Sequence, residues 1–149
     1  MELILWRHAE AADGAPDEAR VLTARGEKQA RKVAAWLGPR LPARARILAS
    51  PARRTVQTAR SLGLKFATDP ALAAGVQEAL RAARWRPDAQ GCAVLVGHQP
   101  TLGRIAALLL TGQERDLAIR KATLWWFDSR GRDEGSPILL RAVIGPDLA

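Results

Sequence analysis

The sequence predicts an α/β protein of three layers, in which helices cover both faces of a mostly parallel central sheet. Short apolar runs alternate along the chain with segments whose apolar residues recur at helical spacing, the pattern of strand–helix–strand units. Some of the runs are continuously apolar, as in strands buried on both faces. The 149 residues are 48% hydrophobic and 26% charged, which suits a single folded domain over residues 1–149 and excludes a disordered chain.

The first strand and the loop after it are predicted at the start of the chain. Glu2–Arg7 is a short apolar run that ends in charge, which indicates a buried strand. His8–Arg20 is polar and contains Gly14 and Pro16, which favour a loop.

A helix with one apolar face follows this loop. Thr23 is suited to cap its start, Gly26 is a tolerated exception in its first turn, and Gly38-Pro39 ends it. Its apolar face consists of Ala30, Val33, Ala34 and Leu37.

The next strand and helix are predicted from capping signals. Arg46–Ala49 is a short strand, and Ser50 is placed to cap a helix with Pro51 at its first position. We expect this helix to run to about Leu62 and to end at Gly63.

The remaining elements continue the alternation. A short strand, a helix, a continuously apolar strand and a further helix ending near Gly112 are followed by two strands. A polar turn over residues 129–136 joins these last two strands. In chain order we expect the first three at Leu64–Thr68, Ala73–Arg84 and Ala93–Val96. The further helix is marked by the apolar residues from Leu102 to Leu109, and the two last strands are expected at Thr123–Asp128 and Ile138–Ile144.

Charge and composition narrow the possible partners. The net charge is +8, and 19 of the 23 basic residues are arginine, whose planar fork suits phosphate and carboxylate groups. A phosphorylated or acidic protein is favoured over nucleic acid, for which no motif is present. Cys92 is the only cysteine, and no apolar run is longer than the six residues Ile105–Leu110. We therefore expect no disulfide, no membrane span and a cytoplasmic location.

Both histidines follow predicted strands at their carboxyl ends, where α/β sheets bind ligands. His8 follows the first strand directly after Arg7, and His98 follows the continuously apolar strand. Arg54 lies one helical turn after Pro51 and is expected to point back toward the same edge of the sheet. Two histidines without clustered carboxylates make a poor metal site. Two arginines with two histidines instead predict a site for a phosphoryl dianion.

The motifs around these residues resemble the histidine phosphatase superfamily, also called phosphoglycerate-mutase-like. The resemblance rests on Arg-His-Ala at Arg7–Ala9, on Ser-Pro-x-x-Arg-x-x-Gln-Thr-Ala at Ser50–Ala59, on Val-Gly-His-x-Pro at Val96–Pro100, and on the helix start at Leu22–Gly26. The family has glycine where this chain has the last residue of the first motif. The small size and the Arg-His-Ala-Glu-Ala stretch are most similar to the SixA-like phosphohistidine phosphatases.

This resemblance implies a two-step phosphoryl transfer without metal or cofactor. His8 would attack phosphorus and become phosphohistidine, while Arg7, Arg54 and His98 would hold the phosphoryl oxygens. Lys121 is an additional candidate for substrate binding.

The sequence lacks the carboxylate that most of the superfamily carries as general acid shortly after the third strand. The resemblance places this carboxylate at Ala73 or Ala74, with Asp69 earlier and Glu78 later in this sequence. A missing acid favours a phosphorylated nitrogen over an alkyl ester. The predicted substrate is therefore phosphohistidine on a signalling protein, such as a histidine-containing phosphotransfer domain. A small-molecule phosphomonoesterase of the same fold and a non-catalytic phosphate-recognition module remain alternatives.

Overall fold

The central feature of the fold is a six-stranded sheet. The computed structural model of the chain describes residues 1–129 and 138–149, so most of the predicted polar turn lies outside the described residues. The strands are β1 (Glu2–Arg7), β2 (Arg46–Ala49), β3 (Ala67–Thr68), β4 (Cys92–Gly97), β5 (Leu124–Asp128) and β6 (Leu139–Ile144). Their order across the sheet is β3-β2-β4-β1-β5-β6.

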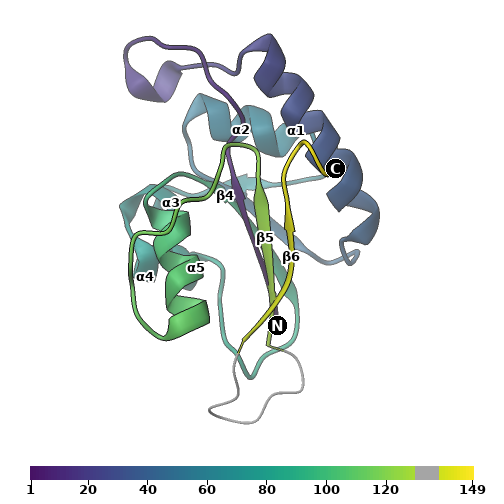
Figure 1. The fold of residues 1–149 in the computed structure, drawn as a ribbon, viewed down its shortest axis with the longest axis vertical. Coiled ribbons are helices and arrows are strands. Elements are labelled where there is room, and N and C mark those ends of the chain that lie inside the picture. Colours follow the sequence, from purple (N-terminus) through teal and green to yellow (C-terminus); the bar gives the residue numbers. More distant parts are fainter. Residues whose placement is uncertain (130–137) are drawn as a thin grey trace.

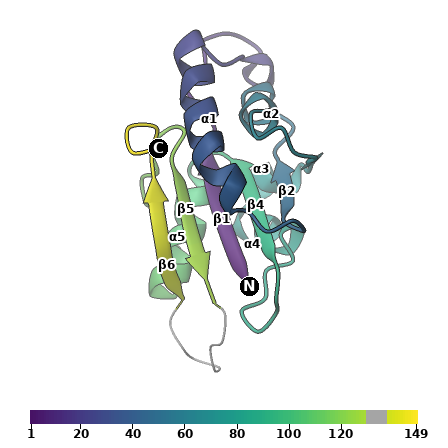
Figure 2. The ribbon, with the colours of Figure 1, turned by 90° about the vertical axis from the view of Figure 1, so that its right-hand side faces the viewer.

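The sheet is parallel over four strands and antiparallel at one side. β1 and β2 both pair in parallel with β4, and β3 pairs in parallel with β2. β5 runs antiparallel to β1, and β6 antiparallel to β5. The expectation of a mostly parallel sheet is therefore confirmed, and the carboxyl ends of the four parallel strands share one edge (Figure 2).

Helices cover both faces of the sheet, as the alternation predicts. Figure 1 shows α3, α4 and α5 on one side of the strands and α1 and α2 on the other. The helices are α1 (Ala24–Leu37), α2 (Arg53–Arg60), α3 (Ala71–Ala74), α4 (Val76–Ala82) and α5 (Thr101–Thr111), with short 3-10 helices at Asp17–Ala19 and Gly38–Arg40.

Alternate residues of β1 pack into two different cores. Leu3 and Leu5 lie in the cluster that includes residues of α3, α4 and α5. Ile4 and Trp6 lie in the cluster that includes residues of α1 and α2. All four side chains are fully buried, which explains why this strand has no polar face in the sequence. The five tryptophans belong to these clusters as buried or partly buried members.

The start of α1 agrees with the cap predicted at Thr23, and its packing explains why a glycine stands at position 26. The Thr23 hydroxyl accepts a hydrogen bond from the backbone N–H of Gly26 at 2.9 Å, as an N-cap does. A Cβ atom on Gly26 would lie 1.9 Å from the carbonyl oxygen of Glu10. Gly26 therefore allows α1 to pack directly on the backbone that follows His8, and it is required there rather than tolerated.

Three of the expected element boundaries are wrong. The helix expected from Ser50 begins at Arg53, because the Ser50 hydroxyl bonds other side chains and makes no cap. The helix expected over 73–84 is divided by Gly75 into α3 and α4. The strand expected over 64–68 contains only the two residues of β3. No helix in the described part of the chain has the length and hydropathy needed to cross a bilayer.

Candidate active site

Three neighbouring parallel strands bring the candidate residues to one edge of the sheet. Arg7 at the end of β1 is in register with Gly97 at the end of β4, and Ala49 at the end of β2 is in register with Val96. The next residues along the chain are His8, His98 and Ser50. Since adjacent strands lie about 4.8 Å apart, these three residues form a row. The ring centroids of His8 and His98 are 5.4 Å apart, with an interplanar angle of 57°.

The His8 ring is held in one tautomer by its own backbone neighbour. Its Nδ1 lies 2.8 Å from the carbonyl oxygen of Ala9. A carbonyl only accepts, so Nδ1 donates its proton there, and Nε2 keeps an unshared lone pair in the neutral ring. The backbone N–H of Ala9 donates to the Thr58 hydroxyl on α2 at 3.1 Å. The segment that orients the ring is thus fixed on both sides.

Both histidines are neutral at pH 7. Burial lowers the pKa of His8 to about 4, the Ala9 hydrogen bond acts in the opposite direction, and the nearby His98, Arg54 and Arg7 lower it further. Burial also lowers the pKa of His98 to about 4, with Arg54 as the next cause. Two neutral imidazoles beside two guanidinium groups offer both a nucleophile and positive charge for an oxyanion.

Arg54 points into the site from the first turn of α2, whereas Arg53 is exposed, as the helical spacing predicts. One terminal nitrogen of Arg54 lies 3.2 Å from Nδ1 of His98. The same nitrogen donates to a carboxylate oxygen of Asp17 at 3.0 Å, and the other donates to the Asp17 carbonyl at 2.9 Å. Arg54 is therefore buried between a histidine and an acidic loop.

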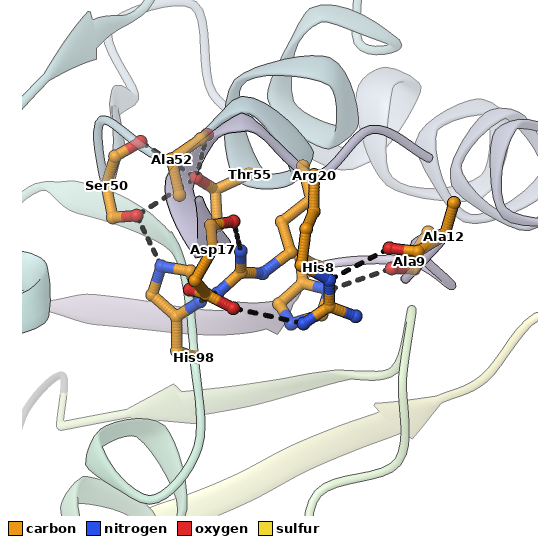
Figure 3. Close-up of polar contacts among 10 residues, drawn as sticks. His8, Ala9, Ala12, Asp17, Arg20, Ser50, Ala52, Thr55 and His98 are labelled. Carbon is orange, nitrogen blue, oxygen red and sulfur yellow. Dashed lines mark hydrogen bonds and ion pairs between the residues drawn. The ribbon is translucent and has the colours of Figure 1, made fainter. Parts of the chain in front are cut away.

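The tautomer of His98 follows from its two partners. Arg54 can only donate, so Nδ1 of neutral His98 accepts, and Nε2 carries the proton. Nε2 donates to the Ser50 hydroxyl (Figure 3). Ser50 in turn is 3.0 Å from the Thr55 hydroxyl, which donates to the carbonyl of Ala52 at 2.6 Å. Ser50 is fully buried and connects β2, α2 and His98 in one hydrogen-bonded chain.

Asp17 is a site residue that the sequence analysis missed. It stands on the short 3-10 helix of the loop after His8. It bonds Arg54 at 3.0 Å, and it also bonds Arg20, as Figure 3 shows. The hydrogen bond from Arg20, followed by that from Arg54, holds the pKa of the Asp17 carboxyl below its usual range. The site therefore contains an anionic carboxylate at neutral pH. In the sequence, nothing distinguishes Asp17 from the other acidic residues of this loop.

The side chain of Arg7 is held by the segment before β5. One terminal nitrogen donates to the carbonyl of Ile119 at 2.6 Å. The Nε atoms of Arg7 and Arg54 are buried without a hydrogen-bond partner among the described residues. Buried guanidinium donors without partners are rare, and both belong to the pair expected to bind a phosphoryl group. Lys121 is exposed, and with Arg7 it lines a groove that extends away from the histidines.

The residues considered for a general acid lie directly after β3 and on α3 and α4. Ala73 and Ala74 are exposed on α3. Asp69 accepts a hydrogen bond from the backbone of Ala71 at 2.9 Å, and Glu78 forms an ion pair with Arg81 at 3.0 Å. Among the described residues, no group of three or more His, Cys, Asp or Glu side chains is arranged to hold a metal ion.

Known proteins share this fold over the whole of their length. A protein histidine phosphatase SixA in complex with tungstate is 24% identical, with a TM-score of 0.79 over 99% of this chain and 98% of that one. A protein assigned as the phosphohistidine phosphatase SixA of Nakamurella multipartitia is 25% identical, with a TM-score of 0.77 over 97% and 95%. Its counterpart from Agrobacterium tumefaciens is 22% identical, with a TM-score of 0.77 over 97% of both chains. No curated protein sequence matches the chain.

A family model settles the relationship that the motifs suggest. The model of the histidine phosphatase superfamily, branch 1, matches residues 3–85. This range is more than half of the chain, and it includes most of β1, all of β2 and α2, and the residues Arg7, His8 and Arg54. The structural likeness extends the same fold through β4 and His98 to the end of the chain. The protein therefore belongs to the histidine phosphatase superfamily, branch 1.

Proposed function

We propose that this protein is a phosphohistidine phosphatase that removes the phosphoryl group from a histidine of a signalling protein, such as a histidine-containing phosphotransfer domain. The observation that supports this proposal is the state of His8. Its Nδ1–H is bonded to the Ala9 carbonyl, and its low pKa leaves Nε2 unprotonated at pH 7. The likeness to SixA structures, one of them with a bound tetrahedral oxyanion, supports the same activity.

In the first step, the Nε2 lone pair of His8 forms a bond to phosphorus as the bond from phosphorus to the substrate nitrogen breaks. The electron pair of the broken bond returns to the substrate imidazole, which leaves neutral because its other ring nitrogen carries a proton taken from solvent. Arg7 and Arg54 balance the charge on the transferring oxygens. A phosphoryl dianion near His98 favours its protonation, after which Nδ1–H can donate to a phosphoryl oxygen while Nε2–H stays bonded to Ser50.

In the second step, water attacks the phosphorus of phosphorylated His8, and the P–N bond breaks with its electron pair returning to Nε2. One proton of the water passes to solvent, and phosphate leaves. The Ala9 carbonyl has a part in both steps, because it keeps the proton on Nδ1 and so keeps the phosphorylated ring cationic. A cationic ring departs as neutral imidazole without a proton donor.

The same argument separates the substrate classes. An alkoxide needs a proton to leave, and general acid catalysis typically contributes about 10²- to 10⁴-fold. Asp17 is anionic at neutral pH, and Asp69 and Glu78 are engaged in helix contacts. The site therefore favours a phosphorylated nitrogen over an alkyl phosphate.

The test compares phosphate release from phosphoimidazole, p-nitrophenyl phosphate and an alkyl phosphate, with wild-type protein and with His8→Ala. We expect the rates to fall in that order and His8→Ala to be inactive on all three. Protein denatured at alkaline pH, where phosphohistidine is stable, should carry phosphate on a histidine that is absent in His8→Ala. A preference for the alkyl phosphate would favour a general phosphomonoesterase, and binding without turnover would indicate a recognition module.

A further inference from the structure

A basic groove begins at Arg7 and extends from the site along α1. It has a volume of about 570 Å³. Six cationic side chains and one carboxylate are among the described residues that line it. The cations are Arg7, Arg25, Lys28, Lys32, Arg120 and Lys121, and the carboxylate is Asp147. The wall formed by α1 lies beside the C-terminal segment at the carboxyl edge of the sheet (Figure 2).

Most of this positive charge is not neutralised by the protein itself. Arg25 is 3.7 Å from Glu10, and Arg120 is 4.0 Å from Asp147, both as exposed ion pairs, which are weak. Lys28, Lys32 and Lys121 form no ion pair with any described residue. Lysines massed in one groove repel each other, so the groove is electrostatically prepared for an anionic ligand.

Its shape fits an extended acidic segment. Arg25, Lys28 and Lys32 lie on one stripe of α1, and they span about 10 Å at the helical rise per residue. That length corresponds to about three residues of extended chain. None of the described residues that line the groove is aromatic, so none offers a ring on which a nucleic-acid base could stack. Such stacking is a main contribution to single-strand binding.

We propose that this groove binds an acidic stretch of the substrate protein next to its phosphorylated residue. The link to the site is Arg7, which adjoins His8 and also lines the groove. A phosphoryl group held at Arg7 and His8 places the flanking residues of its carrier over α1. This inference rests on the proposed function for its substrate, and it adds a specificity for acidic sequence around the phosphorylated side chain.

The test uses two synthetic peptides that differ only in the residues around one phosphohistidine, glutamate in one and glutamine in the other, with phosphoimidazole as the small substrate. Each exposed charge pair changes binding by a small factor, so we expect wild-type kcat/KM to be about tenfold higher for the glutamate peptide. Lys28→Glu/Lys32→Glu should abolish this preference and leave kcat/KM for phosphoimidazole unchanged. Added salt should weaken the preference.

A matched control carries the same change of net charge elsewhere. Arg44 and Lys65 are exposed and precede the parallel strands β2 and β3, so they lie toward the opposite edge of the sheet. Arg44→Glu/Lys65→Glu should retain most of the preference. An equal loss of the preference for the glutamate peptide in the two double variants would overturn the proposal. The preference would then depend on the overall charge of the protein and not on the groove.

The remaining outcomes separate the groove from the proposed function. If wild type hydrolyses phosphoimidazole but does not prefer the glutamate peptide, the groove proposal is wrong and the function stands. If no substrate is hydrolysed, the function is wrong, and binding of the fluorescent unphosphorylated peptides still tests the groove. Binding of single-stranded DNA that Lys28→Glu/Lys32→Glu abolishes, without preference between the peptides, would assign the groove to nucleic acid.

Discussion

Replacing Ser50 with alanine tests whether the buried hydroxyl supports catalysis through His98. The change removes the acceptor of His98 Nε2–H at a position that is 0% exposed, where water is poorly placed to replace it. An unpaired buried donor costs about 1–3 kcal/mol, which corresponds to about a 5- to 150-fold loss in rate constant. We expect kcat/KM for phosphoimidazole to fall within this range.

The pH dependence distinguishes this role from a general loss of structure. The hydrogen bond to Ser50 is stronger when His98 is protonated, so its loss lowers the pKa of His98 in the phosphoryl complex. Since kcat reports groups in that complex, its decline at alkaline pH should move to lower pH in Ser50→Ala.

Ser61→Ala is the matched control. The Ser61 hydroxyl donates to the carbonyl of Thr58 at 2.6 Å, at the far end of α2 from His98. Ser61→Ala should lower the stability of the protein to an extent similar to Ser50→Ala, while it leaves the pH profile of kcat unchanged. If Ser50→Ala keeps kcat/KM within about twofold of wild type, with an unchanged profile, Ser50 does not position His98 and the reasoning is refuted.

Three further predictions concern stability and anion binding. His8 has a lowered pKa, so the unfolded chain binds its proton first as pH falls below 6.5. The free energy of unfolding, measured with urea, should therefore fall from pH 7 to pH 5. His8→Asn should make this decrease smaller by about 2 kcal/mol. A decrease of the same size in His8→Asn would show that His8 titrates normally. Asp17→Asn removes an anion that competes with bound oxyanions for Arg54, so it should lower the inhibition constant of orthovanadate severalfold. A higher inhibition constant in this variant would mean that the Asp17 carboxylate assists binding. Gly26→Ala places a methyl group against the Glu10 carbonyl and should cost about 2–3 kcal/mol, and a stabilised variant would contradict the packing of α1.

The sequence predicts the fold well where burial alone determines the structure. β1 and β4 are surrounded on both faces by helices, so their apolar runs mark them clearly. The start of α1 is equally clear, because Thr23 makes its local cap in the folded protein. The positions of His8 and His98 at strand ends follow from those strands, and their separation of 5.4 Å follows from strands that are neighbours in the sheet.

Elsewhere, tertiary contacts override local signals. Ser50 has the sequence context of a helix cap, yet its hydroxyl bonds His98 and Thr55, and α2 begins three residues later. That choice depends on a histidine 48 positions away in the chain, which no local pattern reveals. Asp17 is similar, since its role depends on Arg54 of α2 and on a loop without periodicity.

In the proposed mechanism, the leaving group explains why a site without a protonated carboxyl completes the whole cycle with a phosphorylated nitrogen. In the first half-reaction the bond to a substrate imidazole breaks, and in the second the bond to the His8 imidazole breaks. The second half-reaction must proceed in any enzyme that is phosphorylated on His8. The Ala9 carbonyl makes this half-reaction possible because it holds the proton on Nδ1 of the ring. A substrate whose leaving group is also an imidazole needs only a proton on its other ring nitrogen, which the solvent supplies. An alkyl ester would make the first half-reaction harder than the second, and the anionic Asp17 cannot supply the missing proton.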